Sequence, residues 1–321
     1  MKAAIRNKYG LPEVLSIITM SLIPQPKKDE ILVKVKATTV NRTDCGVLTG
    51  KPWIIRCFIG LFKPRRVITG TDFSGIVVAK GVDVTNFDIN DDVYGFFDEG
   101  LCSHASYVCV SIKKSVLKKP INITYEQAAA SLEGAHYAFY FLDKVNIKAG
   151  DKVLINGGTG AIGNAALQFL KYKGANVTVT CPTAYVDVLK SIGADEVIDY
   201  TNDDFTKLNQ QFNFVFDAVG KSSFGKCKPI LKSKGIYISS ELGAYWQNPF
   251  LALLSLVMRG KKVKFPLPLS IHRSMAFINE LIEQDKFIPL IDRRYLLEEI
   301  PEAFSYALAG QKKGNVVISF S

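Results

Sequence analysis

The stretch VLINGGTGAIG, Val153 to Gly163, decides the fold. It is typical of a short buried strand that enters a glycine-rich turn and continues as a helix. Gly158, Gly160 and Gly163 satisfy G-x-G-x-x-G, and Gly157 stands directly before them. Such glycines let the backbone turn tightly, admit a pyrophosphate close to amide groups, and let helix and strand pack together. The pattern predicts a dinucleotide-binding turn; the alternative is a turn with a structural role only.

Strands and helices alternate on both sides of this turn. Helices are predicted at 161–173 and about 184–192, and strands at 152–156, 175–181, 193–200, 212–220, 235–243 and 261–265. Strands separated by helices imply right-handed crossovers and a parallel sheet. The fold class is therefore α/β, with a Rossmann-type doubly wound parallel sheet.

The chain before this region has a different pattern of apolar and polar residues. Residues 30–41 and 73–81 alternate apolar and polar side chains, which predicts a β-rich first part, and Pro120 precedes a change to helical periodicity. The last 50 or so residues are predicted to form a helix, a loop and a final strand that return to the first part. We expect a β-rich domain at 1–120, a dinucleotide-binding domain at 121–268 and a C-terminal return at 269–321.

The composition narrows the class of protein to which the chain can belong. The 321 residues are 48% hydrophobic and 22% charged, as in ordinary globular chains. Six cysteines without a CxxC pair favour reduced thiols. The start lacks a secretory pattern, and the longest apolar run, 250–258, is too short to span a bilayer, so we expect a cytoplasmic protein without a membrane partner.

The formal net charge of +10 has two interpretations. It is either a solvated basic surface or a field that attracts anionic ligands such as a phosphorylated cofactor. No stretch interleaves basic and aromatic residues in a nucleic-acid-binding motif, so nucleic acid is an unlikely partner.

The tip of the second strand bears on which dinucleotide binds. An NAD site usually has Asp or Glu there, and this tip, Thr180 to Tyr185, has no acid before Asp187. A 2′-phosphate would meet no carboxylate, and three hydroxyls, those of Thr180, Thr183 and Tyr185, could donate to it. No Arg or Lys stands at the tip, however. NADPH is favoured, and NADH remains possible.

Several motifs in order resemble those of the medium-chain dehydrogenase/reductase superfamily. They are VNRTDCG (40–46), TGTDFSGIV (69–77), GGTGAIG, GADEVIDY, FDAVG and the terminal GNVVISF. The resemblance runs essentially from end to end and is closest to the zinc-free quinone oxidoreductase and enone reductase branch. It implies a GroES-like catalytic domain before the Rossmann domain.

The same resemblance predicts that no zinc binds. Zinc alcohol dehydrogenases of the superfamily have a cysteine ligand where Asn41 stands and a histidine where Thr71 stands. Asparagine and threonine are poor zinc ligands. Residues 81–101, where the structural zinc lobe would lie, contain no cysteine.

A reaction without a metal suits an acceptor that is already electrophilic. Nothing lowers the pKa of an alcohol here, whereas a quinone, an enone or a related aldehyde can take hydride directly from a nicotinamide. The protein then has to align the two ring systems and to offer a hydrogen-bond donor. The competing hypotheses are an NADPH-binding protein with little turnover that acts through partners or RNA and, less favoured, a zinc alcohol dehydrogenase.

The site residues follow from the glycine turn and from the resemblance. The predicted catalytic residues are Asn41, Arg42 and Tyr137. For Asn41 the alternative is a turn residue that bonds its own backbone. The residues predicted to contact the cofactor are Asn41, Gly157, Gly158, Thr159, Gly160, Ala161, Ile162, Gly163, Thr180, Cys181, Thr183, Tyr185, Val219, Gly220, Ser240 and Glu241.

Some roles stay open from the sequence. Glu241 and His136 have no decided function, and a buried structural role is favoured for His136. The apolar segment 50–66 forms either the wall or lid of a substrate pocket, or part of the core or of a subunit contact. Residues 245–266 look too apolar for solvent, and the resemblance implies a homodimer formed there by sheet extension.

Overall fold

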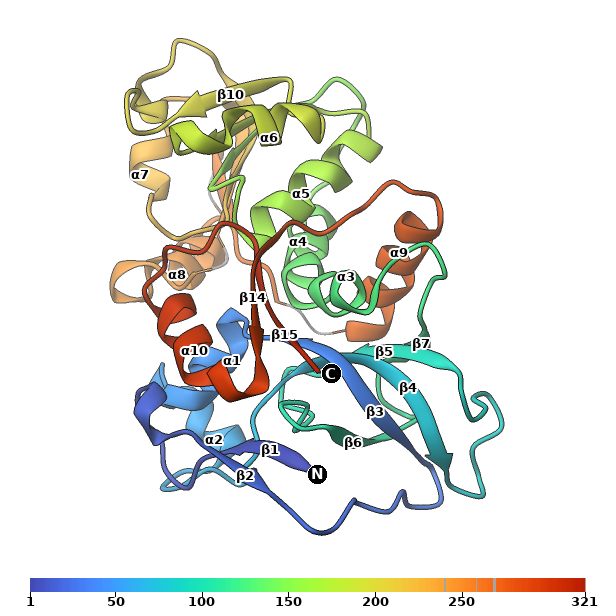
Figure 1. Ribbon diagram of the computed structural model, residues 1–321. Helices are drawn as coiled ribbons and strands as arrows, with labels where there is room; N and C mark the ends of the chain where they lie inside the picture. Colours follow the sequence, from blue (N-terminus) through green and yellow to red (C-terminus); the bar gives the residue numbers. More distant parts are fainter. Residues whose placement is uncertain (240, 258, 268–269, 321) are drawn as a thin grey trace. The chain divides into compact units, whose positions relative to one another are not determined.

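The computed structural model describes residues 1–239, 241–257, 259–267 and 270–320, and its chain divides into two compact units. Unit 1 consists of residues 1–133, 271–283 and 289–321, and unit 2 of residues 134–270 and 284–288. The domain boundaries predicted at residues 120 and 268 remain predictions. Figure 1 shows the course of the chain in each unit.

Unit 2 is built on a six-stranded parallel sheet. Its strands are β8 (Lys152–Asn156), β9 (Asn176–Cys181), β10 (Glu196–Asp199), β11 (Phe212–Asp217), β12 (Leu231–Ser239) and β13 (Lys262–Lys264). They lie in the order β10-β9-β8-β11-β12-β13, so the chain reverses direction across the sheet between β8 and β11. The predicted doubly wound fold is confirmed, and ligands of such sheets bind outside the strands' carboxyl ends at this switch point.

Buried apolar strands and amphipathic helices hold unit 2 together. Val153, Leu154 and Ile155 of β8 are fully buried, as expected for a central parallel strand covered on both faces. The helices of this unit are α4 (Glu133–Asp143, whose first residue belongs to unit 1), α5 (Ala161–Tyr172), α6 (Val186–Ser191), α7 (Phe224–Cys227) and α8 (Gln247–Leu254).

Unit 1 contains a seven-stranded sheet and a separate pair of strands. The sheet runs β14-β15-β3-β4-β5-β7, with β6 also paired to β3. Its strands are β3 (Glu30–Thr39), β4 (Asp72–Lys80), β5 (Asp92–Phe96), β6 (Tyr107–Ser111), β7 (Val116–Lys118), β14 (Ile291–Leu296) and β15 (Asn315–Ser319); the pair is β1 (Lys2–Ile5) and β2 (Ser16–Thr19). The helices are α1 (Arg42–Thr49), α2 (Arg56–Ile59), α3 (Tyr125–Ala130), α9 (Ile271–Glu283) and α10 (Ile300–Leu308).

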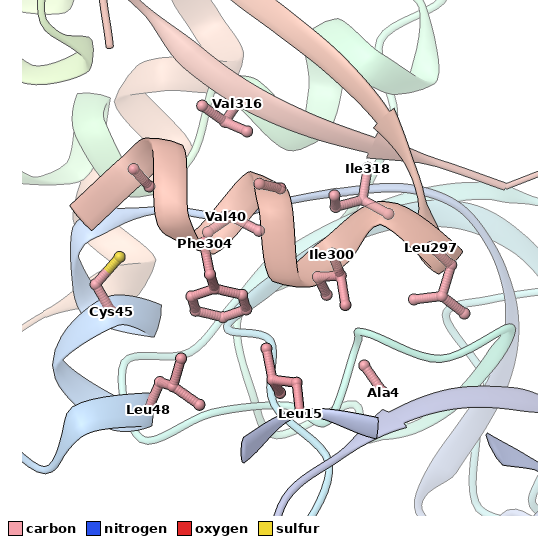
Figure 2. Packing of buried hydrophobic residues seen from close by; sticks show 12 residues of the cluster. Ala4, Leu15, Val40, Cys45, Leu48, Leu297, Ile300, Phe304, Val316 and Ile318 are labelled. Carbon is pink, nitrogen blue, oxygen red and sulfur yellow. The ribbon is translucent and has the colours of Figure 1, made fainter. Parts of the chain in front are cut away.

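One hydrophobic cluster of unit 1 fixes α1. Cys45 and Leu48 of α1 pack with Ile300 and Phe304 of α10, and Figure 2 shows these side chains between the two helices. All four are at most 3% exposed. The last residues of the chain therefore hold the helix that follows Asn41.

The prediction for the C-terminal part was incomplete. The final helix and strand occur as α9 and β15, but the segment predicted as a loop contains β14 and α10. None of the described helices has the length and apolar character that a membrane span requires.

Candidate functional site

The turn after β8 requires three of its four glycines for reasons internal to the protein. Gly157 has φ +89°, and a Cβ there would lie 2.4 Å from Val219 Cγ1. A Cβ on Gly158 would lie 2.9 Å from Val179, and one on Gly163 would lie 2.1 Å from the carbonyl oxygen of Gly157. These positions make the turn tight and let α5 pack against it.

Gly160 is different. Its backbone angles, φ −63° and ψ 160°, suit any residue, and a Cβ would have only the Gly157 oxygen within 4 Å, at 3.7 Å. The protein itself therefore does not need glycine at this position. A side chain there would project into space that a ligand approaching the turn would use.

The helix that begins at this turn can hold an anion. Gly160 is the N-cap of α5, no side chain caps the helix, and its first turn contains no acidic residue. The first N–H groups of a helix have no intrahelical acceptor, and the helix dipole adds partial positive charge. Such a terminus beside a glycine turn suits a phosphate or pyrophosphate.

Buried polar side chains join four strand ends below the turn. Thr180 of β9 donates its hydroxyl to Asn156 Oδ1 of β8 at 2.9 Å, and Asn156 Nδ2 donates to Asp217 Oδ1 of β11 at 2.9 Å. The Tyr237 hydroxyl of β12 donates to Asp217 Oδ2, also at 2.9 Å. We call Thr180, Asn156, Asp217 and Tyr237 the cross-sheet chain; the first three are at most 6% exposed and Tyr237 is fully buried.

The cross-sheet chain also holds the two turns that follow β8 and β11. The Gly157 amide donates to Thr180 Oγ1 at 2.9 Å, and the Gly220 amide donates to Asp217 Oδ1 at 3.0 Å. Sequence reasoning missed Asn156, Asp217 and Tyr237. The available signal was a polar residue at the end of an otherwise apolar strand, as at Asn156 and Asp217.

The second turn lies beside the first. Val219 is in contact range of Gly157, and a Cβ on Gly220, at φ +65°, would lie 2.4 Å from Glu241 Cγ. The structure thus brings together the predicted residues 157–163, Val219, Gly220 and Glu241 at the carboxyl ends of β8, β11 and β12. Ser240, also predicted to contact the cofactor, lies outside the described residues.

The structure corrects the role predicted for Thr180. Its side chain is fully buried, and its hydroxyl is engaged by Asn156 and the Gly157 amide, so it supports the turn and cannot donate to a 2′-phosphate. Cys181 is likewise fully buried. Within the turn, Thr159, Ala161 and Gly163 are buried, whereas Gly160 and Ile162 are partly exposed.

A second correction concerns charge at the tip of β9. The Thr183 hydroxyl donates to Asp199 Oδ2 at 2.5 Å, because β10 pairs with β9 and brings Asp199 opposite Cys181. Hydrogen bonds, first that from Thr183, lower the pKa of Asp199. An ionised acid therefore lies beside Thr183, which reasoning along β9 alone did not detect. Tyr185 is half-buried nearby in the chain.

Asn41 has a structural role in unit 1. It is the N-cap of α1: its Oδ1 accepts from the Asp44 amide at 2.9 Å, and Asp44 Oδ2 accepts from the Asn41 amide at 3.2 Å. Its Nδ2 donates to Thr71 Oγ1 at 2.7 Å and to Asp72 Oδ2 at 3.0 Å. Asn41 is 1% exposed, and its side-chain amide is engaged within unit 1; its predicted catalytic and cofactor contacts remain predictions.

The contact between Asn41 and Thr71 also bears on metal binding. These are the positions at which the resemblance places the cysteine and histidine ligands of zinc relatives, and here the two side chains bond each other. Among the described residues, no group of three His, Cys, Asp or Glu could hold a metal ion. That no zinc binds remains a prediction.

The neighbours of Asn41 form a buried acidic pair. Asp72 accepts from the Thr39 amide at 2.7 Å, and burial raises its pKa to about 6. Burial, and after it the charge of Asp72, raises the pKa of Asp44 well above its usual value. The pair therefore keeps a proton to higher pH than exposed aspartates would.

His104 lies 3.9 Å from Asp44 but does not neutralise it. Burial lowers the pKa of His104 to about 4, so the imidazole is neutral at neutral pH. Its Nε2 lies 2.9 Å from the Thr39 carbonyl oxygen, which can only accept, so Nε2 carries the proton. Nδ1 then accepts from the Thr69 hydroxyl at 2.7 Å.

The other predicted catalytic residues divide between the two units. Arg42 is exposed in unit 1, and Tyr137 is half-buried in unit 2, with its ring 5.5 Å from that of His136. His136 is fully buried, and burial lowers its pKa to about 4. It is therefore neutral and packs among aromatic rings.

Part of the segment 50–66 lines a cavity of about 100 Å³ in unit 1. Phe58, Ile59, Arg65 and Arg66 of this segment share the cavity with residues that include Arg6 and Thr71. Other apolar members, among them Trp53 and Phe62, are exposed. The segment does not enter the core.

Two family patterns match the chain. Residues 27–125 match the alcohol dehydrogenase GroES-like domain, and residues 192–318 match the family described as zinc-binding dehydrogenase. Together they extend over both units.

Known proteins match over nearly the whole chain. A 2-methylene-furan-3-one reductase of Solanum lycopersicum is 30% identical, over 99% of this chain and 79% of its own length. An NADPH-dependent alkenal/one oxidoreductase of Arabidopsis thaliana, described as chloroplastic, is 28% identical over the same shares. The solved quinone oxidoreductase of Coxiella burnetii superposes with a TM-score of 0.86 at 28% identity, covering 100% of this chain and 99% of its own.

Proposed function

Because the chain belongs to the medium-chain dehydrogenase/reductase superfamily, in its quinone-oxidoreductase-like branch, we propose that it reduces quinones or α,β-unsaturated carbonyl compounds with NADPH. The proposal joins two kinds of support. Relatives over the full chain carry these activities in their names, and unit 2 offers a turn suited to a dinucleotide.

Gly160 is the observation that carries the proposal. It is the one glycine of G-x-G-x-x-G that neither backbone angles nor neighbouring atoms require. Where neither the backbone angles nor the neighbouring atoms require glycine, a ligand that occupies the space of the missing side chain explains why glycine is present. The uncapped start of α5 beside it suits the negative charge of a pyrophosphate.

The residues of unit 2 have distinct parts in this proposal. The Gly158–Gly163 turn and the start of α5 would hold the pyrophosphate, while Val219 and Gly220 would border the path toward the nicotinamide. The cross-sheet chain fixes both turns from below. When bound, the nicotinamide supplies hydride, and an acceptor that is already electrophilic needs little further acid or base chemistry.

The choice of NADPH over NADH now depends mainly on the relatives. Asp199 beside Thr183 removes part of the sequence argument, because a carboxylate opposes a 2′-phosphate. The Arabidopsis relative is named as NADPH-dependent, and NADPH remains the proposed cofactor. Dissociation constants of NADPH and NADH, measured side by side, decide between them.

We also propose a homodimer formed at the β13 edge of the sheet. β13 ends the strand order, and apolar side chains of and after α8 are exposed there: Phe250 (62%), Leu253 (65%), Leu256 (77%) and Val257 (83%). Exposed edges and large apolar patches favour association. Light scattering gives the mass; a monomer at micromolar concentration would contradict the proposal.

A cytoplasmic location is kept as a proposal.

The experiment for the reaction is direct. The protein is mixed with NADPH and a panel of quinones, enones, aldehydes and alcohols, and the loss of nicotinamide absorbance is followed. We expect consumption with quinones or enones. Tight binding of NADPH without consumption across the panel would favour a binding protein, and stoichiometric zinc together with alcohol oxidation would favour a zinc dehydrogenase.

A further inference from the structure

The segment Gly50–Arg66, which we call the basic apolar segment, exposes bulky apolar side chains. Trp53 is 63% exposed, Phe58 65% and Phe62 91%, and Ile54 and Leu61 are more than 40% exposed. Single exposed apolar residues are normal, but five within ten residues of chain mark a surface of contact.

Charge accompanies these apolar side chains. The segment carries five cations, Lys51, Arg56, Lys63, Arg65 and Arg66, and no Asp or Glu. Within the described part of the chain none of the five forms an ion pair. Arg56 and Arg65 donate instead to carbonyl oxygens of the segment, those of Gly50 and Phe58, both at 3.1 Å. The positive charge is therefore not cancelled within the segment.

The segment has a defined backbone that includes the short helix α2. The Tyr9 hydroxyl donates to the Gly60 carbonyl at 2.5 Å, and the Arg65 amide donates to the Ile59 carbonyl at 2.8 Å. Gly60 has φ +122°, where a Cβ would lie 2.1 Å from the Lys63 carbonyl oxygen. The backbone of the segment is thus held by hydrogen bonds, while the large apolar side chains named above are exposed to solvent.

We propose that the basic apolar segment docks on an anionic membrane surface. Trp, Phe and aliphatic side chains enter the boundary between headgroups and acyl chains, and Lys and Arg meet lipid phosphates. The basic apolar segment would bind at the surface of one leaflet, without a helix that spans the membrane. This proposal revises the expectation of no membrane partner.

A comparison within the molecule favours lipid over a protein partner. The exposed apolar stretch of unit 2, residues 245–257, has no charged residue, which suits a second copy of the chain. The basic apolar segment instead combines apolar side chains with uncancelled positive charge, which complements anionic headgroups. Two of its five exposed apolar residues, Ile54 and Leu61, offer no stacking surface for RNA bases, whereas the three aromatic ones do, so RNA binding is one of the outcomes that the test below separates.

Sedimentation with vesicles tests the proposal. We expect the protein to bind vesicles of phosphatidylcholine and phosphatidylglycerol, to release them at high salt, and to bind phosphatidylcholine alone much less. Lys51→Glu with Lys63→Glu should weaken binding by at least about 25-fold, since each basic residue contributes about fivefold. Trp53→Ser with Phe62→Ser should also weaken it.

Matched variants control for net charge and for hydrophobicity. Lys27→Glu with Lys28→Glu changes the charge of exposed residues by the same amount elsewhere, and Ile121→Ser removes a side chain that is 100% exposed. Equal weakening in the Lys27/Lys28 variant would mean that the charge of +10 alone attracts vesicles, and would overturn the proposal. So would a fall in mass of the Trp53/Phe62 variant, which would assign the segment to a second copy, or preferential RNA binding through the segment. Turnover of a water-soluble quinone without vesicles tests the reductase function separately.

Discussion

Each unit contains a buried polar network, and the two networks differ in where their hydrogen bonds end. In unit 1, Asn41, Asp44 and Asp72 bond each other and the neighbouring threonines. In unit 2, the cross-sheet chain ends on the amides of Gly157 and Gly220, which belong to turns at the sheet's carboxyl edge. The first network is closed in the sense that its hydrogen bonds stay among buried groups of unit 1, where Asp44 Oδ1 accepts none from the described residues. The second network supports backbone that a ligand can approach.

This difference separates residues that stabilise from residues that bind. A closed buried network contributes stability and offers no donor to a ligand, however closely its residues match a family motif. A network that ends on turn amides transmits its geometry to the ligand. Substitutions in unit 1 should therefore change unfolding, and substitutions in unit 2 should change cofactor affinity.

The largest effect is expected from Gly160→Val. The new side chain would take the space of the pyrophosphate and remove charged hydrogen bonds, each worth about 1.5–3 kcal/mol, so NADPH affinity should fall at least about 100-fold. Isothermal titration gives the dissociation constant. The fold should be retained, because a Cβ at position 160 has no contact closer than 3.7 Å.

Gly163→Ala is the matched control for that variant. Its Cβ would lie 2.1 Å from the Gly157 oxygen, so it should disturb folding rather than binding alone. A folded Gly160→Val protein with unchanged affinity for NADPH would show that this turn does not hold the pyrophosphate. The difference drawn here between the two networks would then fail.

Asn41→Ala should act on stability. It removes the cap of α1, the donor to Thr71 Oγ1 and one of the donors to Asp72, so the free energy of unfolding should fall by about 2–3 kcal/mol. Urea unfolding measures this, and Asn41→Ser, which keeps a capping oxygen, should recover part of it. Unchanged stability together with a tenfold loss of kcat would instead support Asn41 as a catalytic residue.

Thr180→Val should act on the cofactor. It removes the hydroxyl that the Gly157 amide and Asn156 share, and the KM for NADPH should rise about tenfold with little change in kcat. Thr178→Val is the control, because Thr178 is buried on the same strand but donates to Glu196, away from the turn. If both variants change the KM for NADPH equally, the cross-sheet chain has no special part in positioning.

The fold was predictable where the residue pattern of an element by itself indicates its structure. The central strands β8 and β11 of unit 2 are largely apolar because they are covered on both faces, and the glycine spacing marks the turn. β14 was missed because Arg293 and Arg294 are exposed and its apolar period is weak; its pairing with β15, not its own burial, makes it a strand.

The site was predictable in its backbone and less so in its side chains. Glycine spacing predicted the tight turn between β8 and α5, whose contact with a cofactor remains a proposal. The partners of Asn41, Thr71 and Asp72, were not foreseen because they come about 30 residues later, and Asp199 was overlooked because it reaches Thr183 from the neighbouring strand. Such partners depend on strand pairing, which a linear motif does not contain.

The smallest effect is expected from Asp44→Asn, which replaces a carboxyl by an amide of nearly the same shape. Because the pKa of Asp44 is raised in the folded protein, the unfolded chain releases its proton first as pH rises above about 4. The folded state then binds more protons, so the contribution of Asp44 to the free energy of unfolding falls with pH. The difference in the free energy of unfolding between wild type and variant, from urea unfolding at several pH values, should fall as the pH rises from about 4 to 7.

Asp91→Asn gives the opposite sign in the same unit. A hydrogen bond from the Asp88 amide, and after it one from Lys118, lowers the pKa of Asp91, so its contribution to stability is present above the unfolded pKa and is lost as pH falls. The wild-type difference for Asp91→Asn should therefore rise with pH while that for Asp44→Asn falls. If both rise, Asp44 is an ordinary ionised carboxylate in the folded protein. The network around Asn41 would then hold two buried negative charges, which requires a cation or an opening to solvent in unit 1 and contradicts the closed network described there.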